Sequence, residues 1–278
     1  KMSGTPWVAD YRDLWSLNHM IKRPWPLQNL EEKFERCIIE QAEHITTVSH
    51  DLSKKIQSLI RRKDIVTVIH NGFDNDYHPN SRLQKSEKLT ISYTGNIYPH
   101  QDPRPFIKAI KRLKDANILS SQNSQALFYG INLDPIRPLS EAFGVSDIVK
   151  CRGNISHAES LQRQMASDIL LMLGWHSSGQ KGIVTGKLFE YLGADRPILC
   201  TGPGSDEIET ILKETQAGQY CCSDNDTLNT LNGWVEEWQS GGVIAFQPNR
   251  DRVSDFSRER LSKKLSNVLG AVLKAQSH

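Results

Sequence analysis

The chain of 278 residues is 38% hydrophobic and 24% charged, the composition of a globular protein with one large core or two smaller ones. Its 34 basic and 32 acidic residues are spread along the sequence and give a net charge of +2, which excludes a nucleic-acid-binding footprint. No apolar run reaches membrane-spanning length. Basic clusters at residues 61–63 and 108–114 favour solvated helix faces, and a weak attraction to anionic lipid stays open.

The cysteines are odd in number and show no C-x-x-C spacing. They are Cys37, Cys151, Cys200, Cys221 and Cys222. This pattern favours reduced thiols in a cytoplasmic setting, and it argues against a disulfide framework or a zinc site.

The first part of the chain alternates strand and helix patterns. An apolar run at residues 6–15 ends in charged residues, as expected of a buried parallel strand whose carboxyl end opens into a site. Later elements are a helix at 30–42, a strand at 44–49, a helix from 51 to about 63 and a strand at 66–72. The order predicts part of a parallel sheet.

A second series of strands and helices follows a polar linker at residues 75–88. The predicted strands are 89–95, 125–130, 148–153, 168–174, 198–202 and 219–222. The predicted helices are 105–115, 138–143, 158–166, 205–215, 226–239 and 257–273, with a further short helix from 186. Such a series predicts a doubly wound α/β domain, which binds ligands at the carboxyl ends of its strands.

Glycines stand where four of these strands should end. They are Gly95, Gly130, Gly153 and Gly174. A tight turn explains any one of them, but four in succession, followed by Thr185-Gly186-Lys187 at the next crossover, favour a nucleotide site.

The stretch from residue 182 to 200 carries the most specific pattern. Thr185 can cap a helix, Gly186 lets the backbone approach a ligand, and Lys187 adds a cation beside the free amides of the first turn. Glu190 falls on the same helix face as Lys187. Leu188 and its apolar neighbours are expected to anchor the helix on a sheet.

Other motifs have simpler interpretations. Residues 74–76 and 224–226 both match D-x-D, a metal-binding pattern, but Asx residues favour turns on their own account, so no metal site is predicted. The sequence Ser49-His50-Asp51 is better explained by Asp51 as a helix cap than by a catalytic triad. For His176, a role at a donor sugar and a loop position without chemistry both stay open.

At these residues the chain resembles the retaining glycosyltransferases of the GT-B fold, family four, also called group one. The resemblance spans almost the whole chain, and TGKLFEYL followed by RPIL is its most specific element. The weaker elements are DYRDLW, HITTVS, VIHNGFD, YTGNIY, CRGNISHAES and DILLML. The resemblance implies part of a Rossmann-like acceptor domain at 1–80, a Rossmann-like donor domain at 81–252 and a terminal helix at 253–278 that packs back on the first domain.

The resemblance also implies site roles. Glu190 would accept hydrogen bonds from the ribose hydroxyls, and Lys187 would hold the diphosphate and stabilise it as a leaving group. The backbone of Thr185, Gly186 and Leu188 would share the diphosphate. Gly95 and Asn96 would face the phosphates or donor sugar, and Arg152, Asn154 and Ile155 would border the base.

Three departures from the family pattern stand out. The family pattern has an acidic residue eight positions before the ribose-binding glutamate, and this chain has Gly182 there. The pattern also has an arginine and a lysine after the first strand of the donor domain, and residues 96–101 contain neither. On ordinary domain sizes, roughly a hundred residues of the acceptor domain are expected to be missing, so an incomplete chain is expected.

The resulting expectation is an enzyme that moves a sugar from a nucleoside-diphosphate donor to a glycan or lipid-linked acceptor with retention of configuration. It needs neither metal nor cofactor, and it works in the cytoplasm at the inner face of the plasma membrane. The alternatives are an epimerase or phosphorylase of the same fold, or a non-catalytic nucleotide-binding module.

Overall fold

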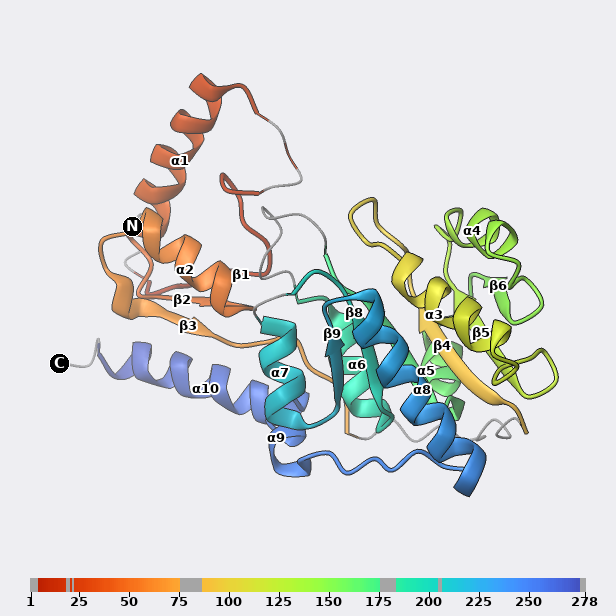
Figure 1. Ribbon diagram of the computed structural model, residues 1–278. Coiled ribbons are helices and arrows are strands. Elements are labelled where there is room, and N and C mark those ends of the chain that lie inside the picture. Colours follow the sequence, from red (N-terminus) through yellow and green to blue (C-terminus); the bar gives the residue numbers. More distant parts are fainter. Residues whose placement is uncertain are drawn as a thin grey trace.

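The computed structural model describes residues 5–18, 21, 23–75, 87–175, 184–204 and 207–275, which form two parallel sheets flanked by helices (Figure 1). The first sheet has three strands, β1 (Val8–Tyr11), β2 (His44–Thr47) and β3 (Val66–Val68), in that spatial order. The second has six strands in the order β6-β5-β4-β7-β8-β9. All strand pairs are parallel, which confirms the predicted doubly wound α/β class.

Helices α1 (Trp25–Ile39) and α2 (His50–Leu59) pack with the first sheet, and a short 3-10 helix, η1 (Lys63–Ile65), leads into β3. Ile39 of α1, Ile45 of β2 and Ile56 of α2 are almost fully buried in one apolar cluster. Burial of these side chains supplies the main force that holds this part together.

The second sheet and its helices make up most of the described chain. The strands are β4 (Leu89–Thr94), β5 (Ser124–Tyr129), β6 (Val149–Gly153), β7 (Ile169–Leu173), β8 (Ile198–Thr201) and β9 (Gly218–Cys221). The helices are α3 (Arg104–Asp115), α4 (Ile136–Ala142), α5 (His157–Ala166), α6 (Gly186–Ala194), α7 (Glu207–Thr215) and α8 (Asp224–Gly241).

Strand β7 shows how both faces of this sheet are covered. Ile169, Leu171 and Leu173 belong to one buried cluster, whereas Leu170 and Met172 belong to another. Successive side chains of a strand point to opposite faces, so helices pack on each side. This explains why the strand is a continuous apolar run in the sequence.

The order of strands reverses in the middle of the second sheet. From β4 the chain adds β5 and β6 on one side, then returns to place β7, β8 and β9 on the other. The carboxyl ends of β4 and β7 therefore form a topological switch point, where ligands bind in open α/β sheets.

The end of β3 leads into a segment that joins the two sheets. Phe73 N donates to Phe256 O at 3.2 Å, and Arg258 N donates to Phe73 O at 2.8 Å. A side chain at Gly193 of α6 would lie within 2.9 Å of Phe73, so only glycine allows this close approach. Helices α9 (Arg250–Ser254) and α10 (Arg258–Lys274) follow, and Figure 1 shows α10 running back toward the side of the first sheet.

Two element predictions were wrong in detail. Helix α1 begins at Trp25, five residues before its predicted start, because Pro24 and Pro26 are compatible with a helix cap and first turn and do not interrupt the helix. Helix α2 is capped by Ser49, whose hydroxyl accepts from Leu52 N at 3.2 Å, and Asp51 lies inside the first turn. Helix α9 was not predicted. Most of the predicted linker, residues 76–86, lies outside the described residues.

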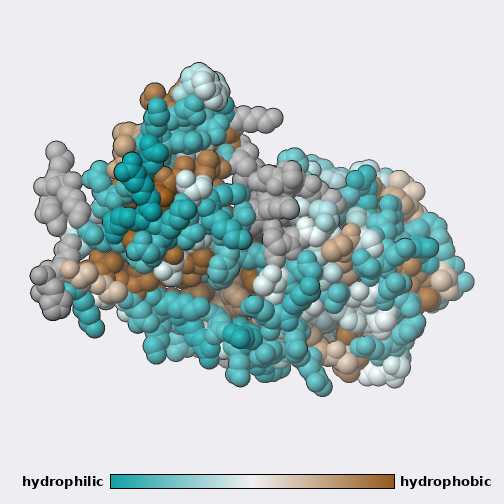
Figure 2. Space-filling view, turned by 60° about the vertical axis from the view of Figure 1, so that its left-hand side comes forward, coloured by the Kyte–Doolittle hydropathy of each residue, from teal (hydrophilic) through white to brown (hydrophobic). Residues whose placement is uncertain are grey.

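Helix α1 exposes a row of large apolar side chains. They are Trp25, Leu27, Leu30 and Phe34, each more than half exposed. Figure 2 shows hydrophobic side chains at the surface of the upper lobe, at the height that α1 has in Figure 1. No helix among the described residues is both long and apolar enough to cross a bilayer. The five cysteines are free thiols, as predicted.

Candidate functional site

The amino end of α6 carries no side-chain cap in the described structure. Thr185 occupies the cap position with extended backbone angles, but its hydroxyl accepts no hydrogen bond from the helix. By contrast, Ser156 caps α5 and Ser223 caps α8 through their hydroxyl groups. Leu188 N donates to Thr185 O, whereas the first-turn amides of Gly186 and Lys187 keep hydrogen-bonding capacity that an anion can use.

Lys187 lies over an aromatic ring at the carboxyl end of β4. Its Nζ is 3.6 Å from the centroid of Tyr93, an arrangement that favours the cation. Gly95, with φ of +117°, makes room, since a Cβ there would lie 3.1 Å from Nζ. Burial lowers the pKa of Lys187 to about 7, and the nearby carboxylate of Glu190 opposes that shift only in part.

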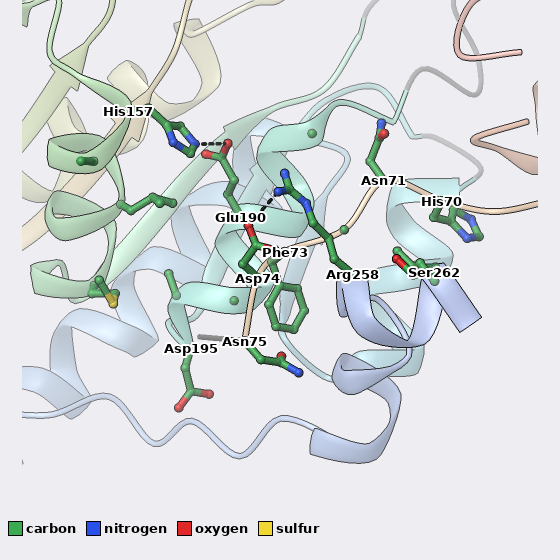
Figure 3. Close-up of a pocket in the computed structure, with 18 of the residues that line it drawn as sticks. His70, Asn71, Phe73, Asp74, Asn75, His157, Glu190, Asp195, Arg258 and Ser262 are labelled. Atoms are coloured by element: carbon green, nitrogen blue, oxygen red, sulfur yellow. Dashed lines mark hydrogen bonds and ion pairs between the residues drawn. The ribbon is translucent and has the colours of Figure 1, made fainter. Parts of the chain in front are cut away.

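Glu190 is held in a defined orientation by two side chains of α5. His157 Nε2 lies 3.1 Å from one carboxylate oxygen, and Gln164 Nε2 donates to the other at 3.1 Å. Gln164 is fully buried and also donates to Thr94 Oγ1 at 2.9 Å. Figure 3 shows His157 and Glu190 pointing toward each other above the cleft. The carboxylate is thus positioned before any ligand arrives.

Tyr191 fastens α6 to the end of β4. Its buried hydroxyl accepts from Thr94 N at 3.0 Å, and burial raises its pKa well above the ordinary value. This bond fixes the height of the helix relative to the switch point.

A cleft of about 1550 Å³ lies between the two sheets beside this helix. Gly186, Glu190 and His157 line it from the second sheet's side, and Arg12 and Asn71 line it from the first. Arg12 donates to Asp10 at 2.9 Å and to Asn71 at 3.0 Å, at the carboxyl ends of β1 and β3. The first sheet therefore faces this space with residues that follow its strands, and the second sheet faces it with α5 and α6; the volume is large enough for a nucleotide-sized ligand.

Asn96 and Leu188, also predicted at the site, are both engaged in contacts within the protein. Asn96 Oδ1 accepts from Ile131 N at 3.0 Å and from Asn132 N at 3.2 Å, so it ties together the loops after β4 and β5. The side chain of Leu188 is fully buried, and its N–H donates to Thr185 O. The structure groups Gly95, Lys187 and Glu190 closely.

The predicted base-side residues lie at and beyond the end of β6, two strands from β4. Arg152 and Asn154 are exposed there, and Ile155 is half-buried. His176 and Gly182 lie outside the described residues.

Several site residues were missed from the sequence. Tyr93, whose ring lies under Lys187, comes two residues before Gly95. The glycine at the end of the strand was therefore the sequence signal that could have pointed to Tyr93. His157 and Gln164 lie on α5, and no spacing in the sequence relates them to Glu190. Of the two D-x-D motifs, Asp74 pairs with Arg258 and Asp224 with Lys108, which agrees with structural roles.

Comparisons with known proteins bear on the fold. A scan against protein-family models and a search of curated proteins found no match for the chain. Among solved structures, Anabaena HepE in complex with UDP and glucose matches with a TM-score of 0.69 and 15% identity, over 97% of this chain and 72% of that one. The fold is GT-B-like.

Two further structures agree with this fold. A glycosyltransferase from Rickettsia africae gives a TM-score of 0.70 at 14% identity, over 96% of this chain and 70% of that one. Sucrose-phosphate synthase from Thermosynechococcus elongatus gives 0.65 at 14% identity, over 97% and 68%. At such low sequence identities, these structural matches establish the architecture alone. The chemistry of this GT-B-like chain has to be argued from its own residues.

Proposed function

We propose that the chain binds a nucleoside-diphosphate sugar at α6 and transfers the sugar to an acceptor. The carrying observation is the grouping of Lys187, the uncapped amino end of α6 and the oriented Glu190 around the switch point. A cation and helix amides suit a diphosphate, and a fixed carboxylate suits the vicinal hydroxyls of a ribose. The solved HepE complex with UDP and glucose supports this choice of ligand class.

The same groups would lower the barrier to transfer. Negative charge develops on the leaving diphosphate as the glycosidic bond breaks, and preorganised donors beside it stabilise that charge. Lys187 and the first-turn amides of α6 are such donors. Retention of configuration and a glycan or glycolipid acceptor are further parts of the proposal, and they rest on the sequence resemblance.

Replacing the lysine tests this function. Lys187→Met keeps an apolar stem of similar length over Tyr93 but removes the cation, so the fold should persist while transfer slows roughly 100-fold or more. Calorimetry with UDP, GDP and ADP and their glucose conjugates, followed by NMR of the product anomer, gives the readouts. Lys213→Met, at an exposed lysine of α7, is the matched control. If wild type binds none of these nucleotides, the proposal fails.

We also propose that the acceptor is reached at a membrane surface. Lys33 and Arg36 are exposed on α1 beside the apolar row of Leu27, Leu30 and Phe34. This combination suits the interface of an anionic bilayer at the inner face of the plasma membrane.

Sedimentation with vesicles of phosphatidylglycerol and phosphatidylcholine tests the membrane contact. The double variant Leu30→Glu and Phe34→Glu should lose most of the binding, and Leu269→Glu, at a half-exposed leucine of α10, should keep it. Equal sedimentation of all three proteins would contradict the membrane role.

A further inference from the structure

Two aromatic rings stack at the carboxyl ends of the central strands of the second sheet. Tyr98 follows β4 and Trp175 follows β7, and their ring centroids lie 5.4 Å apart with 29° between the planes. The side chain of Tyr98 is 42% exposed. Trp175 is partly buried, so Tyr98 forms the exposed face of the pair. An exposed ring stacked on a second ring at a switch point is a feature that packing alone does not require, since apolar rings gain more from burial.

The buried side chain of Gln101 holds the two loops together. Its Nε2 donates to Leu173 O at 2.9 Å, and its Oε1 accepts from Tyr98 N at 3.2 Å. Gln101 N donates to Tyr98 O at 2.9 Å, and residue 101 also forms an antiparallel bridge with Trp175. The positions of both rings are thus fixed by the backbone that carries them.

The pair belongs to the same scaffold as the cation of the site. The hydroxyl of Tyr93 donates to Asn96 O at 2.7 Å and lies 3.5 Å from Gln101 Oε1, while its ring supports Lys187. The loop after β4 therefore joins a phosphate-binding cation to an aromatic surface. Between residues 96 and 101 the chain has no lysine or arginine, so this loop offers a ligand aromatic, amide and imidazole groups and no permanent positive charge.

We propose that the Tyr98–Trp175 pair is a sugar-binding platform that stacks on the C–H face of a pyranose ring. This inference rests on the proposed function, since it assigns the surface beside the diphosphate site to a sugar. Aromatic faces carry negative charge density and attract the polarised C–H groups of a sugar, whose hydroxyls stay available for solvent or protein. A phosphate gains nothing from such a surface. The stacked sugar belongs either to the donor or to the acceptor.

Calorimetry on the intact chain separates these cases. The probes are the diphosphates of uridine, guanosine and adenosine, their glucose conjugates, and maltose in the presence of the diphosphate that binds. Tyr98→Ala should leave diphosphate affinity unchanged. It should lower the affinity for one of the two sugar probes by roughly 3- to 10-fold. A loss for the glucose conjugate identifies the stacked sugar as the donor's, and a loss for maltose identifies it as the acceptor's. Tyr98→Phe keeps the ring and should restore wild-type affinity.

The control is Trp15→Ala, which breaks an edge-to-face aromatic pair with Phe34 near the first sheet and should change neither affinity. Unchanged binding of both sugars in Tyr98→Ala, or no binding of either sugar by wild type, would overturn the platform. Failure of the proposed function gives a different result, because wild type would then bind none of the diphosphates. In that case, maltose binding is measured without a diphosphate.

Discussion

Lys187 is the residue whose chemistry depends most on its surroundings. Burial lowers its pKa to about 7, so without ligand the side chain is a mixture of charged and neutral forms near neutral pH. A bound diphosphate adds negative charge beside Nζ and stabilises the protonated form. Donor binding is therefore expected to take up a proton at and above this pKa.

This coupling gives a pH prediction. Below pH 7 the lysine is already charged, and affinity for UDP-glucose should be nearly constant. Above pH 7 binding must also protonate Lys187, so affinity should fall by about tenfold per pH unit until the pKa of the complex is reached. Calorimetry from pH 6 to 9 in buffers of different ionisation enthalpy measures both effects. Lys187→Met should bind weakly with no such slope, and a steep slope in that variant would assign the proton to another group.

The site could be predicted from sequence only where its residues are close along one helix. Lys187 and Glu190 are three positions apart, and helical spacing places them on one face. The partners of Glu190 come from α5, whose packing against α6 depends on the whole fold. Thr185 shows the other limit: the cap position was predicted correctly, but its hydroxyl makes no capping bond.

Helix α6 is anchored at its middle and end and left open at its start. Tyr191 bonds to Thr94, and Gly193 lies against Phe73, whereas a Cβ at Gly186 would meet no atom of the other described residues within 4 Å outside its own helix backbone. Packing against the described part of the chain therefore does not require the glycine at 186. Gly186 instead leaves space beside the first-turn amides for a ligand that approaches the backbone.

Gly186→Ala tests this element directly. Alanine is a better helix former than glycine, so the free energy of unfolding should stay the same or rise by up to about 1 kcal/mol. Affinity for UDP-glucose should nevertheless fall, because the methyl group occupies the diphosphate's approach. Urea denaturation and calorimetry supply the two measurements. Gly233→Ala in α8, where a Cβ likewise meets no other described residue within 4 Å beyond the helix backbone, should match the stability change with unchanged affinity.

The strands of the second sheet were predicted to within one residue at each end, because most of them are buried runs and several end at or just before a glycine. Helix α1 was harder, since a proline at its cap position and another in its first turn usually mark loops. The packing of residues 69–75 between α6 and α10 was beyond sequence reasoning. It depends on contacts such as Gly72 with Leu261, made by residues far apart in the chain.

At the scale of the whole molecule, one carboxylate links the two sheets. Glu207 opens α7 beside the second sheet, and both of its oxygens lie 2.9 Å from His50 N at the start of α2. One oxygen also lies 2.8 Å from His70 Nε2, just after β3. Burial raises the pKa of Glu207, but the bonds from His70 and the His50 amide outweigh it, and the net pKa is lowered. The same three residues have metal-ligand chemistry, yet the carboxylate is already engaged by protein donors.

Glu207→Gln should therefore weaken the junction between the sheets. The amide keeps an acceptor for His50 N but loses the charge that both partners favour, so we expect a loss of about 1–3 kcal/mol in the free energy of unfolding at pH 7. A carboxyl group whose pKa is lowered by folding stabilises the protein above its ordinary pKa, and that stabilisation disappears as the pH falls through the lowered value. The difference between wild type and variant should then shrink below about pH 4. Glu209→Gln removes a carboxylate in the same helical turn that pairs with Lys213 at the surface, and it should cost less than about 0.5 kcal/mol. Equal losses in the two variants would show that helix charge, and not the contact between the sheets, accounts for the effect of Glu207.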